Sequence, residues 1–293
     1  MLKLKITVDT FSGRENPVVE LKGKEAKDAL ERMQPERRLT KNDLAVPSTP
    51  TLGYRGMVVE QVGATGRRLP KSFRLMHGDL SGKDLNHRAA DASFEEYLLR
   101  DGGPVSKLGL GVRFPNVLKR EIRRFSDVRA GLSVNPAIKW PPTFVCQCAP
   151  LYEPAWWNVP ARQPFNNCYN YATNYRTNTF AQPGRAAGAM YGALTCAAVA
   201  PAAVKDELIN SPLANNKCPG EGHLVALVIW PGHDYHWYRK GRNGLWTHKP
   251  GGTAVTNLDN GGATIADPRT ANRGPYTVFC SFMVVMHGHI RIS

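Results

Sequence analysis

The sequence predicts an α+β protein with two domains. Its 293 residues exceed the usual size of one domain, short strand patterns alternate with amphipathic helices in the first half, and the second half combines a helix with a run of strands. Hydrophobic residues make up 42% and charged residues 21%, which excludes disordered, collagen-like and coiled-coil proteins. We expect a small α+β domain at residues 1–134, an ordered connector rich in proline and tryptophan at 135–165, and a second domain at 166–293.

The first half predicts the element order β-β-α-β-β-α. Residues 3–9 and 16–21 contain short strand patterns on either side of turn-forming residues, which is typical of a hairpin. Residues 23–33 carry an apolar stripe at helical spacing and therefore form a helix. The remaining expected elements are a loop, two strands and two helices, at residues 40–50, 54–62, 72–76, 93–100 and 115–129.

The second half predicts a helix followed by an antiparallel sheet. Residues 223–230 form a continuous apolar run of strand length, which is typical of a strand covered on both faces. Residues 231–234 suit a turn, and Asn243-Gly244 is a strong hairpin signal. The other expected elements are two helices, at 167–176 and within 186–204, and three strands, at 235–240, 245–249 and 276–286.

The formal net charge of +14 raises the question of a nucleic-acid partner. Residues 1–135 carry 25 basic and 17 acidic side chains, and residues 136–293 carry 13 and 7, so the excess is spread along the chain. A dedicated nucleic-acid-binding arm would concentrate it. The densest basic run, at 119–124, falls on one face of an expected helix, and nucleic acid stays only as an alternative partner.

The beginning of the sequence alternates apolar and polar residues and contains no apolar signal segment. The longest mild apolar stretch, at 186–204, is interrupted by glycine and proline and is too weak to span a membrane. We therefore expect a cytoplasmic protein with reduced thiols, with export without a signal peptide as the alternative.

Six cysteines in 293 residues are too few for a disulfide scaffold. The paired or free state of five of them is left open by the sequence: Cys146, Cys148, Cys196, Cys218 and Cys280. Structural zinc sites usually show closer cysteine pairs than this spacing offers, and no cofactor-binding motif is present. We therefore expect neither a metal nor a cofactor.

Cys168 is the candidate nucleophile, because it lies at the expected start of a helix. The helix dipole and the free backbone N–H groups at that end favour a thiolate. The same amides, together with the side chain of Gln163, could stabilise an oxyanion. The base would be a histidine of the following sheet, and we favour His236 because its aromatic and charged neighbours exceed what packing needs. His223 and His248 are the alternatives.

A third group should orient the imidazole of such a base. Asn257 and Asp259 follow His236 in the sequence and are the candidates, with Asp267 as a further choice. If residues 231–234 form the first turn, His223 and His236 share one face of the sheet. If Asn243-Gly244 sets the second turn, His248 lies near Arg239 and faces away from His236, so the three rings form no metal cluster.

The order of Gln163, Cys168 on a helix, histidine on a strand and then Asn257 or Asp259 resembles the papain-like cysteine peptidase superfamily, over about residues 163–285. The resemblance implies a hydrolase or acyltransferase acting on peptide or amide substrates. No tryptophan follows Cys168 and no Asn-Ser-Trp block is present, so the substrate preference does not carry over. The stretch 234–259 also looks like one found in uncharacterised bacterial proteins, a similarity that implies no activity.

An aromatic wall that includes Trp157 and Trp237 would hold the substrate. The same aromatic and arginine side chains also suit a non-catalytic module that binds a peptide, a glycan or a nucleic acid. A bacterial effector or toxin, with residues 1–134 as its adaptor, is a further alternative. The sequence indicates neither the oligomeric state nor the role of residues 1–134.

Overall fold

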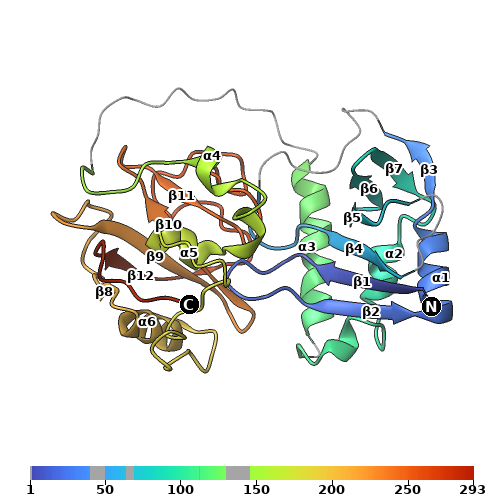
Figure 1. Cartoon of the computed structure of the whole chain (residues 1–293), viewed down its shortest axis with the longest axis horizontal. Coiled ribbons are helices and arrows are strands. Elements are labelled where there is room, and N and C mark those ends of the chain that lie inside the picture. The colour runs from blue at the N-terminus through green and yellow to red at the C-terminus, as the bar shows by residue number, and fades with distance from the viewer. Residues whose placement is uncertain (1, 40–49, 64–68, 112, 130–145) are drawn as a thin grey trace. The chain divides into compact units, whose positions relative to one another are not determined.

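The computed structural model describes residues 2–39, 50–63, 69–111, 113–129 and 146–293, and it confirms the predicted α+β class (Figure 1). The chain divides into two compact units. Unit 1 comprises Met1–Thr10, Asn16–Ser48 and Tyr54–Leu132, and unit 2 comprises Phe11–Glu15, Thr49–Gly53 and Ser133–Ser293. The loop expected at 40–50 and the first part of the expected connector, 135–145, lie outside the described residues except for Pro50.

A seven-stranded antiparallel sheet forms the centre of unit 1, in the order β2-β1-β4-β5-β6-β7-β3. Its strands are β1 (Lys3–Val8), β2 (Val18–Lys22), β3 (Pro35–Arg38), β4 (Met57–Val62), β5 (Ser72–Met76), β6 (Asp79–Gly82) and β7 (Leu85–Ala89). Its helical elements are α1 (Gly23–Arg32), α2 (Phe94–Leu98), the 3-10 turn η1 (Ser106–Leu108) and α3 (Phe114–Arg129). The predicted hairpin, the predicted helices and the four predicted strands, which correspond to β1, β2, β4 and β5, are confirmed, whereas β3, β6 and β7 were not predicted.

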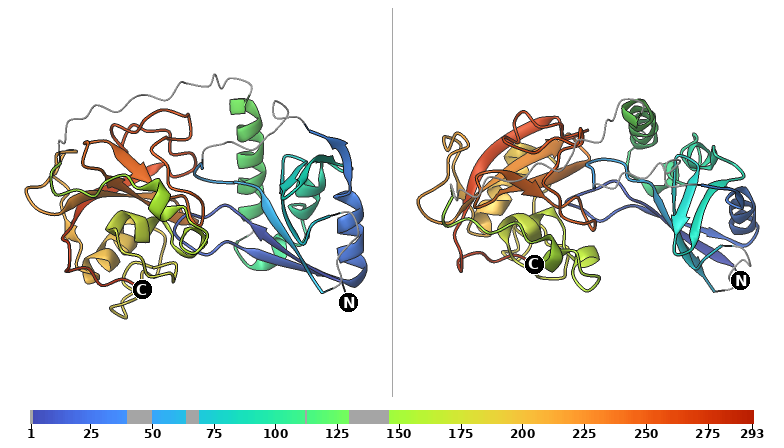
Figure 2. Two further views of the ribbon diagram at one scale, coloured as in Figure 1. Left: turned by 45° about the horizontal axis from the view of Figure 1, so that its top comes forward. Right: turned by 90° about the horizontal axis from the view of Figure 1, so that it is seen from above.

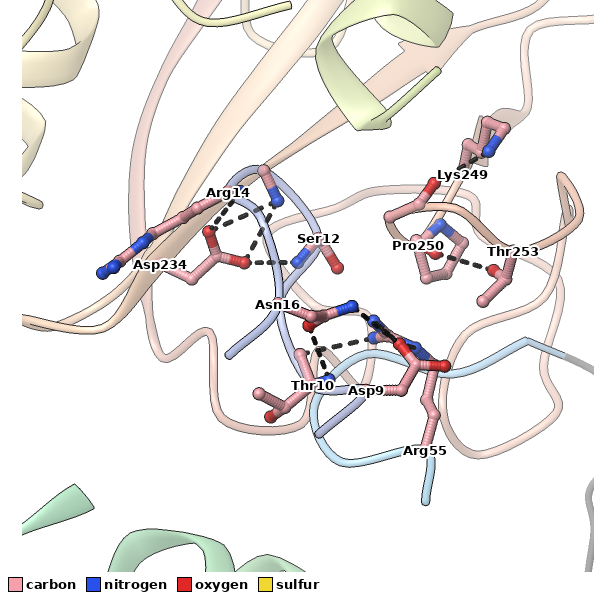
Figure 3. Close-up of polar contacts among 12 residues, drawn as sticks. Asp9, Thr10, Ser12, Arg14, Asn16, Arg55, Asp234, Lys249, Pro250 and Thr253 are labelled. Carbon is pink, nitrogen blue, oxygen red and sulfur yellow. Dashed lines mark hydrogen bonds and ion pairs between the residues drawn. The ribbon is translucent and has the colours of Figure 1, made fainter. Parts of the chain in front are cut away.

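Asp9, which follows β1, is the centre of a cluster of buried polar contacts in unit 1. Its carboxylate accepts hydrogen bonds from Arg55 Nη2 at 2.7 Å, Arg74 Nη1 at 2.9 Å and Asn16 Nδ2 at 3.1 Å; Figure 3 shows its contacts with Arg55 and Asn16. Burial alone would raise the pKa of Asp9, but the two guanidinium groups outweigh it and lower the pKa. These contacts tie β4 and β5 to the end of β1.

Unit 2 contains a five-stranded antiparallel sheet in the order β11-β10-β9-β12-β8. Its strands are β8 (Ile209–Asn210), β9 (His223–Trp230), β10 (Asp234–Lys240), β11 (Trp246–His248) and β12 (Val278–Val285). Its helical elements are α4 (Pro154–Trp157), the 3-10 turn η2 (Gln163–Phe165), α5 (Cys168–Thr173) and α6 (Cys196–Lys205). The helix predicted at 167–176 ends early because Asn174 adopts a left-handed conformation with φ of 59°.

The core of unit 2 lies between the sheet and the helices α5 and α6, which pack against it (Figure 2). Every residue of β9 is buried, as its continuous apolar sequence predicts. The core side chains of the sheet come from alternate positions of three strands: Val225, Leu227 and Ile229 of β9, Tyr235 and Trp237 of β10, and Met283 and Val285 of β12.

Two disulfide bonds close long loops of unit 2. Cys146 is bonded to Cys218, and Cys196 at the start of α6 is bonded to Cys280 in β12. The two bonds join positions 72 and 84 residues apart. The prediction of reduced thiols is therefore wrong for four of the six cysteines, and Cys148 and Cys168 are the free ones.

Candidate functional site

Cys168 is the first residue of α5 and is completely buried. The free N–H groups of this helix end are occupied by its cap residue, because the side chain of Asn167 accepts hydrogen bonds from the N–H groups of Tyr169 at 3.0 Å and Asn170 at 3.1 Å. Burial raises the pKa of the Cys168 thiol well above its usual range, and the charge of Asp234 raises it further. The structure therefore favours the protonated thiol, the opposite of the direction expected from the helix dipole.

His236 lies on the face of the sheet opposite to Cys168. Its neighbours in β10, Tyr235 and Trp237, pack with Cys168 in the core, and successive residues of a strand point to opposite faces. On its own face, His236 Nε2 lies 3.0 Å from His248 Nδ1, and the two rings are nearly perpendicular. The structure thus brings together the two histidines that the sequence argument had separated.

His223 is on the same face as Cys168 but at the far end of α5. Its Nε2 donates a hydrogen bond of 2.7 Å to the carbonyl oxygen of Ala172, four residues beyond Cys168 and so about 6 Å further along a helix axis. Burial lowers the pKa of His223 to about 3. This imidazole is a neutral hydrogen-bond donor that holds the end of α5 to β9.

The two registers expected for this sheet are each wrong by one residue. Asp234 pairs with Trp230, so the first turn is one residue shorter than expected, and His223 and His236 lie on opposite faces. His248 pairs with Tyr238 rather than lying near Arg239, so it shares a face with His236. A slip of one residue moves every side chain of a strand to the other face, which explains both errors.

The hydrogen bonds of His236 and His248 determine which ring nitrogen of each histidine carries the proton. His248 Nε2 donates a hydrogen bond of 2.9 Å to the carbonyl oxygen of Leu258, which can only accept. Burial lowers the pKa of His248 to about 4, although the carboxylate of Asp259 opposes the shift. In the neutral ring, Nδ1 of His248 is therefore the acceptor, and His236 Nε2 is the donor to it.

The predicted orienting residues lie in the loop after β11. Asp259 accepts hydrogen bonds from the N–H groups of Gly261, Ala263 and Asn272, at 2.9, 3.0 and 2.8 Å, and thereby shapes the loop. The carbonyl oxygen of Asn257 accepts a hydrogen bond from Ile265. Both residues hold the loop backbone in the described structure.

The aromatic residues predicted to bind a substrate are inside the protein. Trp157 packs edge-on against Tyr171, and Trp237 is completely buried in the core of unit 2. In the same part of the chain, the exposed aromatic side chains are Trp156, Phe165 and Tyr175, with exposed fractions of 40%, 51% and 42%. Arg162 lies over the Trp156 ring, 4.1 Å from its centroid.

The backbone of Gln163, rather than its side chain, helps to bind the buried ammonium group of Lys249. Its carbonyl oxygen and that of Asn166 each accept a hydrogen bond of 2.6 Å from Lys249 Nζ, and the carbonyl oxygen of Gly251 accepts a third, of 2.8 Å. Lys249 is completely buried. Its role could not be recognised from the sequence, where it follows β11 with no acidic partner nearby.

Asp234 is the other central residue that sequence reasoning missed. Its carboxylate accepts hydrogen bonds from the backbone N–H groups of Ser12, Gly13 and Arg14, at 2.5, 3.1 and 3.1 Å (Figure 3). The hydroxyl of Tyr276 donates another, of 2.5 Å. Burial raises the pKa of Asp234 even though these donors lower it. One side chain thus anchors the loop of residues 11–15 in unit 2.

Within the described residues, no group of three histidine, cysteine, aspartate or glutamate side chains is arranged to hold a metal ion. No helix in the described part of the chain is long and apolar enough to cross a membrane.

Comparison with known proteins gives one informative relative. No family model matches the chain, and no solved structure matches it. The chain is 48% identical over 140 residues to insoluble matrix shell protein 1 of the mollusc Ruditapes philippinarum. The aligned region covers 47% of this chain and 91% of that protein.

This relative corrects three expectations. The description as a bacterial protein is wrong, because the relative is molluscan. The description as a hydrolase and thiol protease is overturned as well, because the relative is named as a matrix protein. The cytoplasmic location is also wrong, because a shell matrix lies outside the cell, and the two disulfide bonds agree with an oxidising compartment. The papain-like resemblance itself stays a prediction.

Proposed function

The chain belongs to the family of insoluble matrix shell protein 1, and from this premise we propose that it is a structural component of an insoluble extracellular matrix. The observation that carries the proposal is the 48% identity, which extends over 91% of the relative. Because the similarity extends over nearly the whole relative, it indicates a shared fold rather than a shared short motif.

The arrangement of unit 2 supports a structural role. Two disulfide bonds hold α6 and the segment around Cys146 to the rest of the unit, which is the usual device of proteins that persist outside the cell. Two charged side chains at its centre hold the fold together: the carboxylate of Asp234 binds a loop, and the ammonium group of Lys249 binds three carbonyl groups. The buried thiol of Cys168 belongs to the apolar core.

A surface for a matrix polymer is offered by the exposed aromatic side chains of unit 2. Trp156 presents a ring that is 40% exposed, with the guanidinium group of Arg162 stacked over it. An aromatic ring packs against the flat apolar face of a sugar, and a guanidinium group binds carboxylate or sulfate. The net charge of +14 also favours an acidic partner. These features support an anionic matrix polysaccharide as the polymer bound.

The proposal is tested by sedimentation of the purified full chain with insoluble extracellular matrix from which mineral and soluble protein have been removed. The protein is expected to enter the pellet and to stay there after washing, whereas bovine serum albumin stays in the supernatant. A chain that remains in the supernatant at every matrix concentration would refute the proposal. A second arm uses Cys148→Ser, which lacks the exposed free thiol and keeps both disulfide bonds, so that retention without disulfide exchange is measured separately.

A further inference from the structure

Three cysteines of unit 2 lie around one short segment of the chain. Cys146 and Cys148 are separated by one residue, and Cys146 is bonded to Cys218. Cys148 is a free, exposed thiol whose Sγ lies 3.6 Å from the carbonyl oxygen of Gly220, two residues beyond Cys218. A free nucleophile and a disulfide bond therefore lie against the same segment, residues 218–220.

The Cys218 end of this disulfide bond is less buried than the Cys146 end. Cys146 is buried, but Cys218 is only half-buried and lines a groove of about 450 Å³ together with Leu213 and Lys217. A thiolate that enters this groove reaches the less buried end of the disulfide bond, and attack at Cys218 makes Cys146 the leaving group. The neighbouring ammonium group of Lys217 favours an incoming anion.

We propose that copies of this chain are joined covalently by thiol–disulfide exchange between Cys148 of one copy and the Cys146–Cys218 disulfide of the next. This inference rests on the proposed matrix function, because it gives that function a chemical route to insolubility. The partner is a second copy of the chain, which presents the same groove.

The step conserves electrons and atoms. The Cys148 thiolate attacks Cys218 Sγ of the second copy, a new S–S bond forms between them, and the Cys146–Cys218 bond of that copy breaks. The electron pair leaves with Cys146, which takes up the proton that Cys148 released. The number of disulfide bonds is unchanged, so the reaction needs no oxidant.

The geometry allows the reaction to continue. The attacked copy still carries its own free Cys148, which can attack a third copy, and the first copy still carries an intact Cys146–Cys218 bond. Each copy therefore has one donor and one acceptor, which is a head-to-tail contact that produces open chains. Cys168 takes no part, because its side chain is completely buried.

The test is incubation of the full chain at pH 8 without oxygen or added oxidant, followed by capping with N-ethylmaleimide and electrophoresis without reductant. We expect a ladder of multimers that a reductant collapses, and peptide mass spectrometry should find Cys148 linked to Cys218. Cys148→Ser should abolish the ladder. Gln147→Ser, a change of the exposed neighbour that keeps Cys148, should leave it unchanged.

Three outcomes would overturn the inference: the same ladder from Cys148→Ser, a wild-type chain that stays monomeric, or a Cys148–Cys218 bond found only within single chains. The proposed function is tested separately by sedimentation of Cys148→Ser, which keeps both disulfide bonds and lacks the exposed thiol that starts the exchange. A wild-type chain that sediments with matrix but forms no multimers in the incubation without reductant retains the matrix role and loses the exchange step.

Discussion

The carboxylate of Asp234 accepts a hydrogen bond of 2.5 Å from the backbone N–H of Ser12, a residue 222 positions earlier in the chain. The following N–H groups of Gly13 and Arg14 bind the same carboxylate, and the ring of Tyr235 leaves no room for a side chain at position 13. The loop between β1 and β2 is thus built into unit 2 by one acidic side chain.

Replacement of this side chain should be costly. Asp234→Ala leaves three backbone N–H groups and the Tyr276 hydroxyl without their buried acceptor, so the free energy of unfolding should fall by about 3 to 5 kcal/mol. Urea denaturation followed by tryptophan fluorescence measures the change. Asp267→Ala, which removes a half-exposed ion pair with Arg269, is the matched control and should cost less than about 1 kcal/mol. Equal effects of the two changes would contradict the anchoring role.

The buried histidines should make unit 2 sensitive to acid. Burial lowers the pKa of His223 to about 3 and that of His248 to about 4, against about 6.5 in an unfolded chain. The unfolded chain therefore binds more protons between these values, so stability is complete above pH 6.5 and falls as the pH falls towards 4. The slope should approach about 1.4 kcal/mol per pH unit for each histidine.

Denaturation curves between pH 4 and pH 7 measure this slope. His223→Gln should make it shallower, whereas His289→Gln, a change at an exposed histidine, should leave it unchanged. A stability that is independent of pH over this range would show that the two rings are not held neutral in the fold.

The disulfide between Cys196 and Cys280 should contribute measurably to stability. It closes a loop of 84 residues, and removal of a bond of this kind costs about 2 to 4 kcal/mol. The double change Cys196→Ala with Cys280→Ala should therefore lower the melting temperature in calorimetry. Cys148→Ser, which removes an exposed free thiol, should leave it unchanged, and a melting temperature unaffected by the double change would contradict the pairing.

The two free thiols should differ in reactivity. In the native chain, iodoacetamide at pH 8 should modify Cys148 and leave Cys168 unmodified, because the first is exposed and the second is buried with a raised pKa. In urea both should react. Peptide mass spectrometry distinguishes the sites, and rapid native labelling of Cys168 would indicate the reactive thiolate that the sequence alone suggested.

The exposed tryptophan should matter for attachment to the matrix. Trp156→Ala removes the ring beneath Arg162 and should weaken sedimentation with insoluble matrix by about tenfold, the effect of losing one good aromatic contact of 1 to 2 kcal/mol. Met190→Ala, which changes a side chain that is 50% exposed elsewhere in unit 2, is the control. Equal loss in both variants would argue against a specific aromatic surface.

Much of the fold could be predicted because its signals are local. The continuous apolar run of β9 and the alternating hairpin of β1 and β2 are readable from a few neighbouring residues. The strands β3, β6 and β7 were missed because they are four or five residues long and lack a clear alternation of apolar side chains. Their pairing in the sheet, rather than their sequence, makes them strands.

The arrangement of the candidate site could not be predicted, for two physical reasons. A turn shorter by one residue reverses which face His236 occupies, and turn length is a weak signal in Pro231-Gly-His-Asp234. The roles of Asp234 and Lys249 depend on backbone groups of distant segments, which have no side-chain signature. Trp157 and Trp237 were predicted to hold a substrate, but tertiary packing buries both of them, which a local sequence pattern does not reveal.

A component of an insoluble extracellular matrix, as we propose this protein to be, should be found where that matrix is found. The most direct measurement is quantitative mass spectrometry of its peptides in the source tissue, separated into cytosol, soluble extracellular protein and the residue that resists extraction with EDTA and detergent. We expect the chain to be concentrated in the insoluble extracellular residue. Recovery of the chain in the cytosolic fraction alone would contradict it.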